Sequence, residues 1–477
     1  MPKRVNEKTQ RLKYVLSDVA SAIVAWVALF SLRKIYIEPQ KFGYSIPFDP
    51  GSDVNFSLGL ILVVVYWLTL YTLTGVYRDI LRRSRLRELV HTINTSFLGV
   101  LFLFFFLLLD DEVKSYKDYY LTFITLFGVH FILTALGRFS ISTQTKRAIQ
   151  SRRIGFPTLL VGNNKKALDL YTELESENKS QGYKFVGLLR LEESNPSVFD
   201  DKLPCLGNVE RIREVVRDYQ VEEVILAIES TEHPKLNAIL NELEGVKVRV
   251  RIIPDMYDII SGSVKINHIL GPALIEVKRD LMPAWQESVK RGMDIVISLM
   301  ALILGIPGYL AIGLAVRLSS KGPIFYRQER IGLNGVPFKI IKFRTMRVDA
   351  EKDGPQLARE KDTRVTKVGF FLRKTRLDEI PQFYNVLKGD MSLVGPRPER
   401  QFFIDQIVQK APHYRLMQRV RPGITSWGQV KYGYAENVDE MVERLKFDLL
   451  YIENMSLAID IKILFYTVLI MVQGRGK

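Results

Sequence analysis

Four long apolar stretches near the N-terminus constrain the fold of this chain more than any other sequence feature. A transmembrane helix needs roughly 17 to 25 mostly apolar residues to cross the hydrocarbon core of a bilayer. The sequence therefore predicts a bundle of four transmembrane helices within residues 1–150. The predicted spans lie at about residues 14–32, 56–77, 89–109 and 119–136.

Basic residues flank these stretches unevenly, and this asymmetry predicts the orientation of the bundle. They crowd the segment before the first span, the loop between the second and third spans, and the segment after the fourth span. The two other loops, at residues 35–55 and 110–118, are poor in excess positive charge. Because Lys and Arg are enriched in cytoplasmic loops, we expect both ends of the bundle, and everything after it, inside the cell.

Residues 151–280 are predicted to form a cytoplasmic α/β domain, because strands alternate with helices and favour a parallel, Rossmann-like sheet. In the loop after the first strand, Gly162 is present, but Asn164 and Ala167 replace the later glycines of the GxGxxG fingerprint. Dinucleotide binding is therefore disfavoured, and a non-catalytic structural or regulatory role is the preferred interpretation. The predicted strands are 158–161, 183–189, 223–228 and 246–253, with a helix at 209–219.

A fifth apolar stretch, Ile295 to Val316, decides the topology of the C-terminal part. It is long enough to span, but spanning would place the many basic residues that follow it outside the cell. Its middle carries Pro307 between glycines, and proline kinks a helix because it removes a backbone donor. We therefore expect a re-entrant helix at about residues 289–320, broken at Pro307, that returns to the face it entered. A kinked spanning helix is the alternative.

The last apolar segment, residues 457–472, is short for a membrane span and contains Asp460 and Lys462. An interfacial helix with its apolar face in one leaflet fits this pattern. A core helix of the soluble domain is the alternative. With the re-entrant helix, this segment belongs to a predicted α+β monotopic domain over residues 281–477.

Composition limits the kinds of partner and cofactor. The net charge of +15 indicates anionic partners, which could be nucleic acid, lipid headgroups or phosphorylated substrates. A single cysteine, Cys205, excludes an intramolecular disulfide and a Cys-based metal site. The five histidines are not spaced as metal ligands.

The stretch LRKTRLDEIPQFYNVLKGDMSLVGPRPER, residues 372–400, carries the candidate chemistry. Its adjacent carboxylates, Asp378 and Glu379, follow Arg373 and Arg376. Carboxylate nucleophiles suit phosphoryl electrophiles, and nearby cations lower a carboxylate pKa and hold phosphate oxygens. The alternative is that the acids merely open a helix and complement its dipole. The density of Arg, Pro and Gly around the pair favours the catalytic interpretation.

Further basic motifs surround this stretch. KIIKFRTM, residues 339–346, is predicted as a strand with Lys342 and Arg344 on one face, and turns near 362–366 and 421–430 have polar tips. Basic residues among aromatics could indicate nucleic-acid binding. A site pressed against a bilayer is poorly placed for RNA or DNA, so we expect no nucleic-acid partner.

In combination, KFRTM, Arg-x-x-x-x-Asp-Glu-x-Pro-Gln, NVLKGDMSLVGPRPE and RPGIT-x-W resemble the bacterial sugar transferase family, which are membrane phosphoglycosyl transferases. The match covers residues 289–477, and the preceding bundle and α/β domain resemble the large form of that family. One departure is Ser426, where the family usually has glycine before the tryptophan. It touches no catalytic carboxylate.

The resemblance implies transfer of a sugar 1-phosphate from a UDP-sugar to undecaprenyl phosphate, with release of UMP, at the bacterial inner membrane. Asp378 would form a covalent phosphosugar intermediate, and Glu379 with Mg²⁺, held by both carboxylates, would stabilise diphosphate charge. Membrane lipids are expected partners, and a homodimer through the bundle and α/β domain is a hypothesis. Further candidates are Lys342 and Arg373 for catalysis, and Arg397, Arg344, Arg376, Arg364 and Arg421 for substrate binding.

Two other functions compete with this one. An inactive scaffold or regulator of polysaccharide assembly would be favoured by loss of Asp378 or Arg397, and both are present. A nucleotide-sugar epimerase or dehydratase would need a Tyr-x-x-x-Lys pair in the α/β domain, where none of the tyrosines has a lysine four residues on. UDP-glucose and UDP-galactose are the first expected donors, and N-acetylated sugars stay open.

Overall fold

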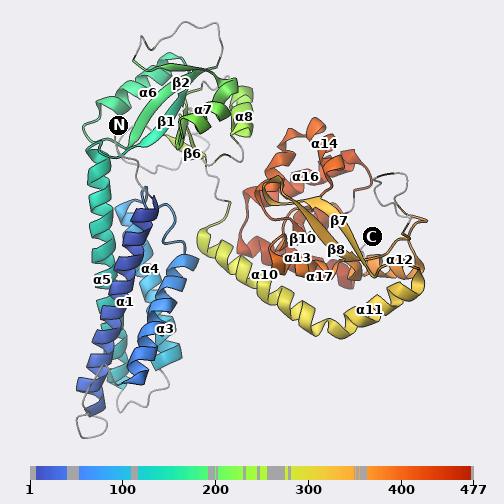
Figure 1. The fold of residues 1–477 in the computed structure, drawn as a ribbon, viewed down its shortest axis with the longest axis horizontal. Helices are drawn as coiled ribbons and strands as arrows, with labels where there is room; N and C mark the ends of the chain where they lie inside the picture. Colours follow the sequence, from blue (N-terminus) through green and yellow to red (C-terminus); the bar gives the residue numbers. More distant parts are fainter. Residues whose placement is uncertain are drawn as a thin grey trace. The chain divides into compact units, whose positions relative to one another are not determined.

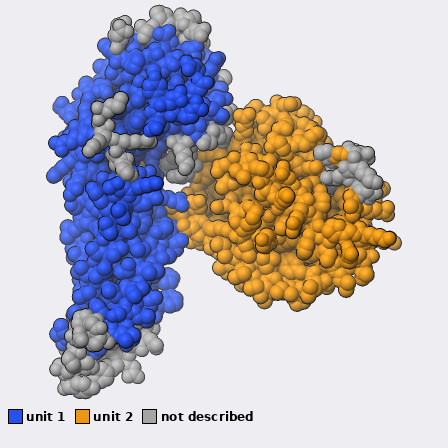
Figure 2. Space-filling model, viewed as in Figure 1, with its two compact units in different colours: residues 1–279 blue, residues 280–477 orange. Residues whose placement is uncertain are grey.

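The computed structural model forms two compact units, residues 1–279 and residues 280–477 (Figure 2), and each is described by itself. Most of the two loops expected on the far side of the membrane, 35–55 and 110–118, lies outside the described residues, as does the predicted domain boundary at 280. The structure describes residues 7–39, 53–108, 116–191, 199, 202–228, 233–243, 246, 248–254, 274–277, 281–348, 350, 354, 362–433 and 435–473.

Apolar helices form the first part of the N-terminal unit (Figure 1). Four of the described helices are long and apolar enough to cross a membrane, as predicted. The fourth runs well past its predicted end at residue 136, to Gln150. The helices are α1 (Glu7–Leu32, continued by a π-helical segment, Arg33–Ile37), α3 (Val54–Leu73), α4 (Arg85–Leu103, continued by Phe104–Leu108) and α5 (Tyr116–Gln150).

A buried ion pair ties the first and last of these helices together. Arg138 of α5 donates from Nε and Nη2 to the two carboxylate oxygens of Asp18 in α1, at 2.9 Å each, and both side chains are buried. The Tyr77 hydroxyl donates to the same carboxylate, and Arg138 also donates to Thr92 of α4. Charges inside a membrane bundle are costly unless paired, so this network favours one arrangement of the helices.

The second part of the N-terminal unit is a mixed six-stranded sheet in the order β3-β2-β1-β4-β5-β6. Strands β1 to β5 pair in parallel, whereas β6 pairs antiparallel with β5, so the prediction of a wholly parallel sheet is wrong at this edge. Antiparallel edge strands are common on otherwise parallel sheets. The strands are β1 (Phe156–Val161), β2 (Tyr183–Arg190), β3 (Cys205–Asn208), β4 (Glu223–Leu226), β5 (Arg249–Ile252) and β6 (Ile275–Val277).

Helices pack apolar side chains against both faces of this sheet. Leu159 and Val161 of β1 belong to one buried cluster, and Leu160 between them belongs to another. This alternation follows from the two-residue period of a strand that is buried on both faces. The helices are α6 (Lys165–Ser176), the 3-10 turn Val209–Arg211, α7 (Ile212–Asp218) and α8 (His233–Glu242).

The C-terminal unit combines helices with two small sheets. Strands β7 and β8 form an antiparallel hairpin, and β9 and β10 pair in parallel. The strands are β7 (Phe325–Ile331), β8 (Pro337–Phe343), β9 (Ser392–Val394) and β10 (Gly423–Thr425). The helices are α10 (Ala284–Leu304), α11 (Ile306–Ser319), α12 (Lys367–Lys374), α13 (Gln382–Lys388), α14 (Gln401–Lys410), α15 (Trp427–Lys431), α16 (Val438–Glu453) and α17 (Leu457–Val472), with 3-10 turns at Leu333–Gly335, Leu377–Glu379 and Pro412–Arg419.

The fifth apolar stretch is two helices, α10 and α11, bent by 63° at the Gly305 break (Figure 1). The N-terminal half of α10 is tied to the rest of the C-terminal unit, because Arg291 donates to the carbonyl of Val386 at 2.7 Å. The far end of α11 is tied to the same unit, because Val316 is buried with Phe343 and Leu372. Both ends of the bent pair are therefore attached to one compact body.

Asp460, one of the two charged residues inside the last apolar segment, has a partner in α10. Lys290 Nζ donates to Asp460 of α17 at 2.6 Å, and the Tyr451 hydroxyl donates to the same carboxylate at 2.7 Å. Ile463, three residues on, is fully buried, whereas Phe465 and Val468 are exposed. Helix α17 thus packs one face into the unit and leaves an apolar face uncovered.

Candidate active site

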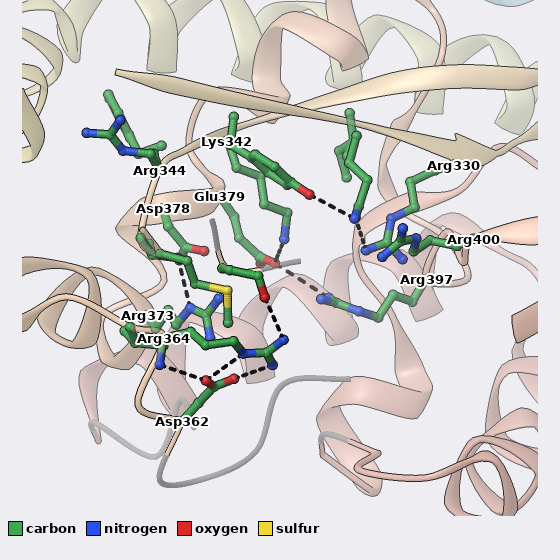
Figure 3. Close-up of a pocket in the computed structure, with 18 of the residues that line it drawn as sticks. Arg330, Lys342, Arg344, Asp362, Arg364, Arg373, Asp378, Glu379, Arg397 and Arg400 are labelled. Carbon is green, nitrogen blue, oxygen red and sulfur yellow. Dashed lines mark hydrogen bonds and ion pairs between the residues drawn. The ribbon is translucent and has the colours of Figure 1, made fainter. Parts of the chain in front are cut away.

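The two candidate carboxylates lie in the short 3-10 turn that follows α12. Helix α12 is capped by the Thr366 hydroxyl, which accepts from the Gly369 amide. The turn begins after Arg376, whose backbone is left-handed with φ of +57°. A non-glycine residue in this region costs about 1 kcal/mol and marks a position that the surrounding structure imposes. This turn directs Asp378 and Glu379 into a pocket (Figure 3).

Glu379 is buried and surrounded by cations (Figure 3). Its Oε1 accepts from Lys342 Nζ at 2.7 Å and lies 3.5 Å from Arg397 Nη1, and its Oε2 lies 3.7 Å from Arg376 Nη1. Burial alone raises the pKa of Glu379, but these cations together lower its pKa well below the ordinary range. Glu379 is therefore a permanently ionised anchor for the surrounding basic groups.

Asp378 is buried as well, but its carboxylate makes no hydrogen bond or ion pair with another residue that the structure describes. Burial raises the pKa of Asp378 to about 6; the charge of Glu379 raises it too, while Lys342 and Arg373 oppose the rise. A buried carboxylate without a hydrogen-bonding partner keeps its lone pairs available to an electrophile. The two adjacent acids thus differ in their contacts: Glu379 is bound to cations, whereas Asp378 has no hydrogen-bonding partner among the described residues.

Lys342 reaches the dyad from β8, and a side chain outside the sheet holds that strand in place. Asn385 of α13 accepts from the Ile341 amide at 3.1 Å and donates to the Lys339 carbonyl at 2.9 Å. The amide of Asn385 thus replaces the hydrogen bonds of a neighbouring strand. Burial lowers the pKa of Lys342, and Glu379 opposes that effect.

The pocket around the dyad has a volume of about 960 Å³ and is rich in arginine. Arg373 lines it and donates from Nε to Thr345 Oγ1 at 2.9 Å. Arg364 lines it and forms a bidentate pair with Asp362, a hydrogen bond that lowers the pKa of Asp362. The described residues hold no group of three or more His, Cys, Asp or Glu side chains that could bind a metal ion.

The structure brings most of the predicted site residues to this pocket, but not all in the same way. Lys342, Arg344, Arg364, Arg373 and Arg397 line it with the dyad. The Arg344 guanidinium, however, donates to the carbonyls of Ser320 and Lys321. Arg421 donates to the Gly389 carbonyl and is not among the described residues that line the pocket.

Sequence reasoning did not single out Arg330 as a site residue, although the hairpin register could have found it. Tyr326 lies opposite Lys342, and residues two apart on a strand share a face. Tyr326, Gln328 and Arg330 all line the pocket, and the Gln328 side chain links the other two. Glu399 joins Arg330 to Arg444 through buried ion pairs.

Comparison with known proteins bears directly on these motifs. A family model described as bacterial sugar transferase matches residues 285–474, and one described as CoA-binding domain matches residues 72–254. The UDP-glucose:undecaprenyl-phosphate glucose-1-phosphate transferase of Klebsiella pneumoniae is 31% identical over 430 residues, which cover 87% of this chain and 90% of that protein. The chain belongs to the bacterial sugar transferase family.

Two further relatives align with about half of this chain. The Escherichia coli K12 protein named UDP-glucose:undecaprenyl-phosphate glucose-1-phosphate transferase is 36% identical over 264 residues, 55% of this chain and 57% of that protein. The Aeromonas hydrophila UDP-N-acetylgalactosamine-undecaprenyl-phosphate N-acetylgalactosaminephosphotransferase is 42% identical over 224 residues, which cover 47% of this chain and 52% of that protein. The aligned part therefore spans just over half the length of these two relatives.

The family departure at Ser426 has a structural role in this chain. Its Oγ accepts from the Gln429 amide at 3.0 Å and caps α15, and the residue is fully buried. Asp448 of α16 accepts from the preceding amide, that of Gly428, at 2.8 Å. Ser426 is not among the described residues that line the pocket, so the substitution shapes a helix start away from the dyad.

Proposed function

We propose that this protein transfers a sugar 1-phosphate from a UDP-sugar to undecaprenyl phosphate, as the first membrane step of a surface glycan. The observation that carries the proposal is the division between the adjacent acids, with Glu379 bound to cations and Asp378 without a partner among the described residues. A carboxylate held free beside cations suits nucleophilic attack on a phosphoryl group. The names of the relatives support the same substrates.

In the proposed first step, an Asp378 oxygen attacks the sugar-bearing phosphorus of the UDP-sugar. A bond forms between the carboxylate and that phosphorus, the bond to the UMP oxygen breaks, and UMP leaves with the electron pair. In the second step, a phosphate oxygen of undecaprenyl phosphate attacks the same phosphorus and releases the Asp378 carboxylate. Splitting the transfer allows a water-soluble and a membrane-bound substrate to use one site in turn.

The basic residues would stabilise negative charge in both steps. Lys342 and Arg397 reach the dyad through Glu379, and Arg373 acts on Asp378 by its charge. Such preorganised cations stabilise the charge that develops on the leaving phosphate. Glu379 holds two of these cations, because its Oε1 accepts from Lys342 Nζ and forms an ion pair with Arg397.

Mg²⁺ is part of the proposal because two carboxylates and a diphosphate fit its coordination. Mg²⁺ is usually bound by one or two carboxylates together with substrate phosphates rather than by an all-protein cage. Asp378 and Glu379 would hold it with the diphosphate oxygens, and the ion would offset phosphate charge. Depleting divalent cations tests whether the reaction requires it.

The transferred sugar is tested with a panel of UDP-sugars and undecaprenyl phosphate, scored by UMP release and by the lipid product. UDP-glucose, UDP-galactose and UDP-N-acetylgalactosamine are the first donors to compare, because relatives are named for glucose and N-acetylgalactosamine transfer. Absence of UMP release and of lipid product with every donor would overturn the proposed function.

We predict that the first half-reaction loses rate as pH falls through about 6. Asp378 must be ionised to attack, and burial raises its pKa to about 6. The rate should therefore be near its plateau at pH 8 and fall about tenfold for each pH unit well below 6. The measurement is the rate of UMP release without lipid acceptor between pH 4.5 and 8. A rate that stays constant down to pH 5 would contradict Asp378 as the attacking group.

We also propose that α10 and α11 form a re-entrant helix that enters and leaves the membrane at the cytoplasmic face. The 63° bend and the attachment of both ends to the C-terminal unit support this topology. A helix that crossed the bilayer would separate its ends by roughly 30 Å of hydrocarbon. The exposed apolar face of α17 would then lie in the same leaflet.

The topology predicts that cysteines placed at Ser288 and at Ser320 react from the same side. In a variant without Cys205, both positions should be labelled by a membrane-impermeant maleimide only in inside-out vesicles. A cysteine placed in the loop expected outside, at residue 112, serves as the control and should be labelled in intact cells. Labelling of Ser320→Cys in intact cells, with Ser288→Cys protected, would indicate a spanning helix.

The α/β domain is proposed to be Rossmann-like and non-catalytic. The order of its first five strands is that of a doubly wound sheet. Gly162 has φ of +133°, and a Cβ there would lie 2.5 Å from the Ala227 carbonyl, so this glycine is explained by packing alone. Homodimerisation through this unit is a separate proposal, and the mass of the detergent-solubilised protein tests it.

A further inference from the structure

The residues that line the pocket around the dyad include two sets of different chemistry. We call the apolar set Pro323, Phe325, Val348 and Phe370 the apolar lobe, and the charged set Arg330, Glu399, Arg400 and Arg444, in which Glu399 pairs with Arg330 and Arg444, the charged lobe. Asp378 and Glu379 line the same pocket as both lobes. Two substrates of opposite character, a nucleotide sugar and a prenyl phosphate, must reach one nucleophile in the proposed reaction.

The apolar lobe is continuous with the re-entrant helices. The Phe343 ring stacks on Phe325 of the lobe at 5.3 Å between centroids, and lies 6.0 Å from the ring of Tyr309 in α11. Leu372 of α12 is buried against Val316 of α11. These contacts connect the wall of the pocket to the helix pair that is proposed to enter the bilayer.

The outer surface of the same elements is unusually apolar. Phe370 and Phe371 of α12 are 62% and 57% exposed, and Leu310, Leu314 and Leu318 of α11 are exposed by more than half. Contiguous exposed apolar surface of this kind marks a membrane or a ligand-binding face. Phe370 belongs to both features, because it is exposed and also lines the pocket.

A cation lies next to these apolar residues on α12. Lys374 ends α12, is exposed, and lines the pocket four residues after Phe370, on the same side of the helix. Arg373 beside it lines the pocket too, and its charge acts on Asp378. Apolar residues next to cations beside a nucleophile complement a long isoprenoid chain that ends in a phosphate monoester.

We propose that the apolar lobe is the binding site of the lipid acceptor, with the phosphate at Lys374 and the first isoprene units on Phe370 and Phe325. The nucleotide sugar then occupies the charged lobe. This assignment rests on the proposed function, since it distributes the two substrates of that reaction. It follows that substitutions in the apolar lobe affect the second half-reaction selectively.

The test compares Phe370→Ser with Phe371→Ser in the full-length protein in detergent. Both residues are exposed on α12, but Phe371 is not among the described residues that line the pocket. Phe370→Ser should raise the KM for undecaprenyl phosphate on the order of tenfold, because the contact of one aromatic ring is lost. Phe371→Ser should change it less than about twofold. The UDP-sugar concentration that gives half the maximal rate of single-turnover UMP release, measured without acceptor, should be the same in the two variants.

Lys374→Ala and Lys367→Ala form a second matched pair. Both lysines are exposed on α12, and Lys367 at the start of the helix is not among the described lining residues. Lys374→Ala should raise the KM for both undecaprenyl phosphate and the short acceptor geranyl phosphate severalfold, because each presents the same phosphate. Phe370→Ser should affect geranyl phosphate less, since fewer isoprene units contact the ring.

Equal effects of the two phenylalanine variants would overturn the assignment, because general membrane attachment would then explain both. A rise in the half-maximal UDP-sugar concentration, with the acceptor KM constant, would also overturn it. If wild-type protein releases no UMP with any donor, the proposed function fails instead. A photoreactive isoprenoid phosphate then decides the lipid site alone: crosslinks to peptides containing Phe325 or Phe370 support it, and crosslinks confined to other segments refute it.

Discussion

Asp378→Asn should abolish sugar-phosphate transfer and at the same time leave the protein at least as stable as wild type. Removing a catalytic nucleophile lowers turnover by more than about 10⁴-fold, because the covalent intermediate can no longer form. Stability should not fall, since the Asp378 carboxylate has no hydrogen bond or ion pair with another described residue. The measurements are UMP release, the mass of the protein incubated with UDP-sugar, and the melting temperature in detergent.

The sign of the stability change depends on pH. Folding raises the pKa of Asp378 from 3.8 to about 6, so ionised Asp378 destabilises the fold above pH 6, and this effect disappears below about pH 4. Asn in its place should stabilise the protein at pH 7.5 by up to about 3 kcal/mol, and should have little effect at pH 4. Asp405→Asn, at an exposed carboxylate of α14, is the control and should keep full activity. UMP release by Asp378→Asn within tenfold of wild type would refute the nucleophile.

Glu379→Gln should lower both activity and stability, although it removes the same charge from the neighbouring position. The substitution removes the carboxylate that accepts a hydrogen bond from Lys342 Nζ at 2.7 Å and leaves this mostly buried ammonium group without its main partner. Removing one partner of a buried ion pair typically costs about 3–5 kcal/mol. Transfer should fall by roughly 10²- to 10³-fold, because Lys342 and Arg397 lose the group that fixes them. Melting temperature and UMP release measure the two losses.

A double variant separates the structural part of this loss from the catalytic part. Lys342→Met with Glu379→Gln removes both charges of the pair, so it should recover much of the stability that Glu379→Gln loses. Its activity should stay low, because Lys342 is itself close to the reacting groups. A Glu379→Gln variant that melts with the wild type would show that the pair contributes no net stability.

The opposite stability effects expected for Asp378 and Glu379 could not be predicted from the sequence. The motif identifies Asp378 and Glu379 as a pair, and local patterns describe the turn in which they lie. The partners of Glu379 come from Lys342 of β8 and Arg397 beyond β9, far away in the sequence. Only the tertiary fold decides which acid receives these cations and which stays free.

Because tertiary contacts cannot be predicted from local patterns, the role of Arg344 was predicted only in part. Arg344 follows a strand whose alternation correctly places it beside Lys342, and it lines the pocket. Its guanidinium nevertheless donates to the carbonyls of Ser320 and Lys321, in the segment just after α11. Asn385 shows the converse. Its sequence context does not indicate that its side-chain amide would form hydrogen bonds with the backbone of β8.

The membrane helices were the most predictable part, because the thickness of the bilayer constrains the sequence directly. Four such helices are present among the described residues, near their predicted positions. The central strands of the α/β domain were predictable, because strands that are buried on both faces are continuous apolar runs in the sequence. Its short edge strands, β3 and β6, carry too few residues to show a period and were missed.

The ion pair between Lys290 and Asp460 has a consequence for biosynthesis. Lys290 lies near the start of the C-terminal unit, whereas Asp460 lies 170 residues later, in its last helix. While the chain emerges from the ribosome, α10 is made long before the carboxylate that pairs with its lysine. The unit can therefore complete its packing only after translation has reached α17, and a chain that stops before residue 457 would leave Lys290 without its ion-pair partner.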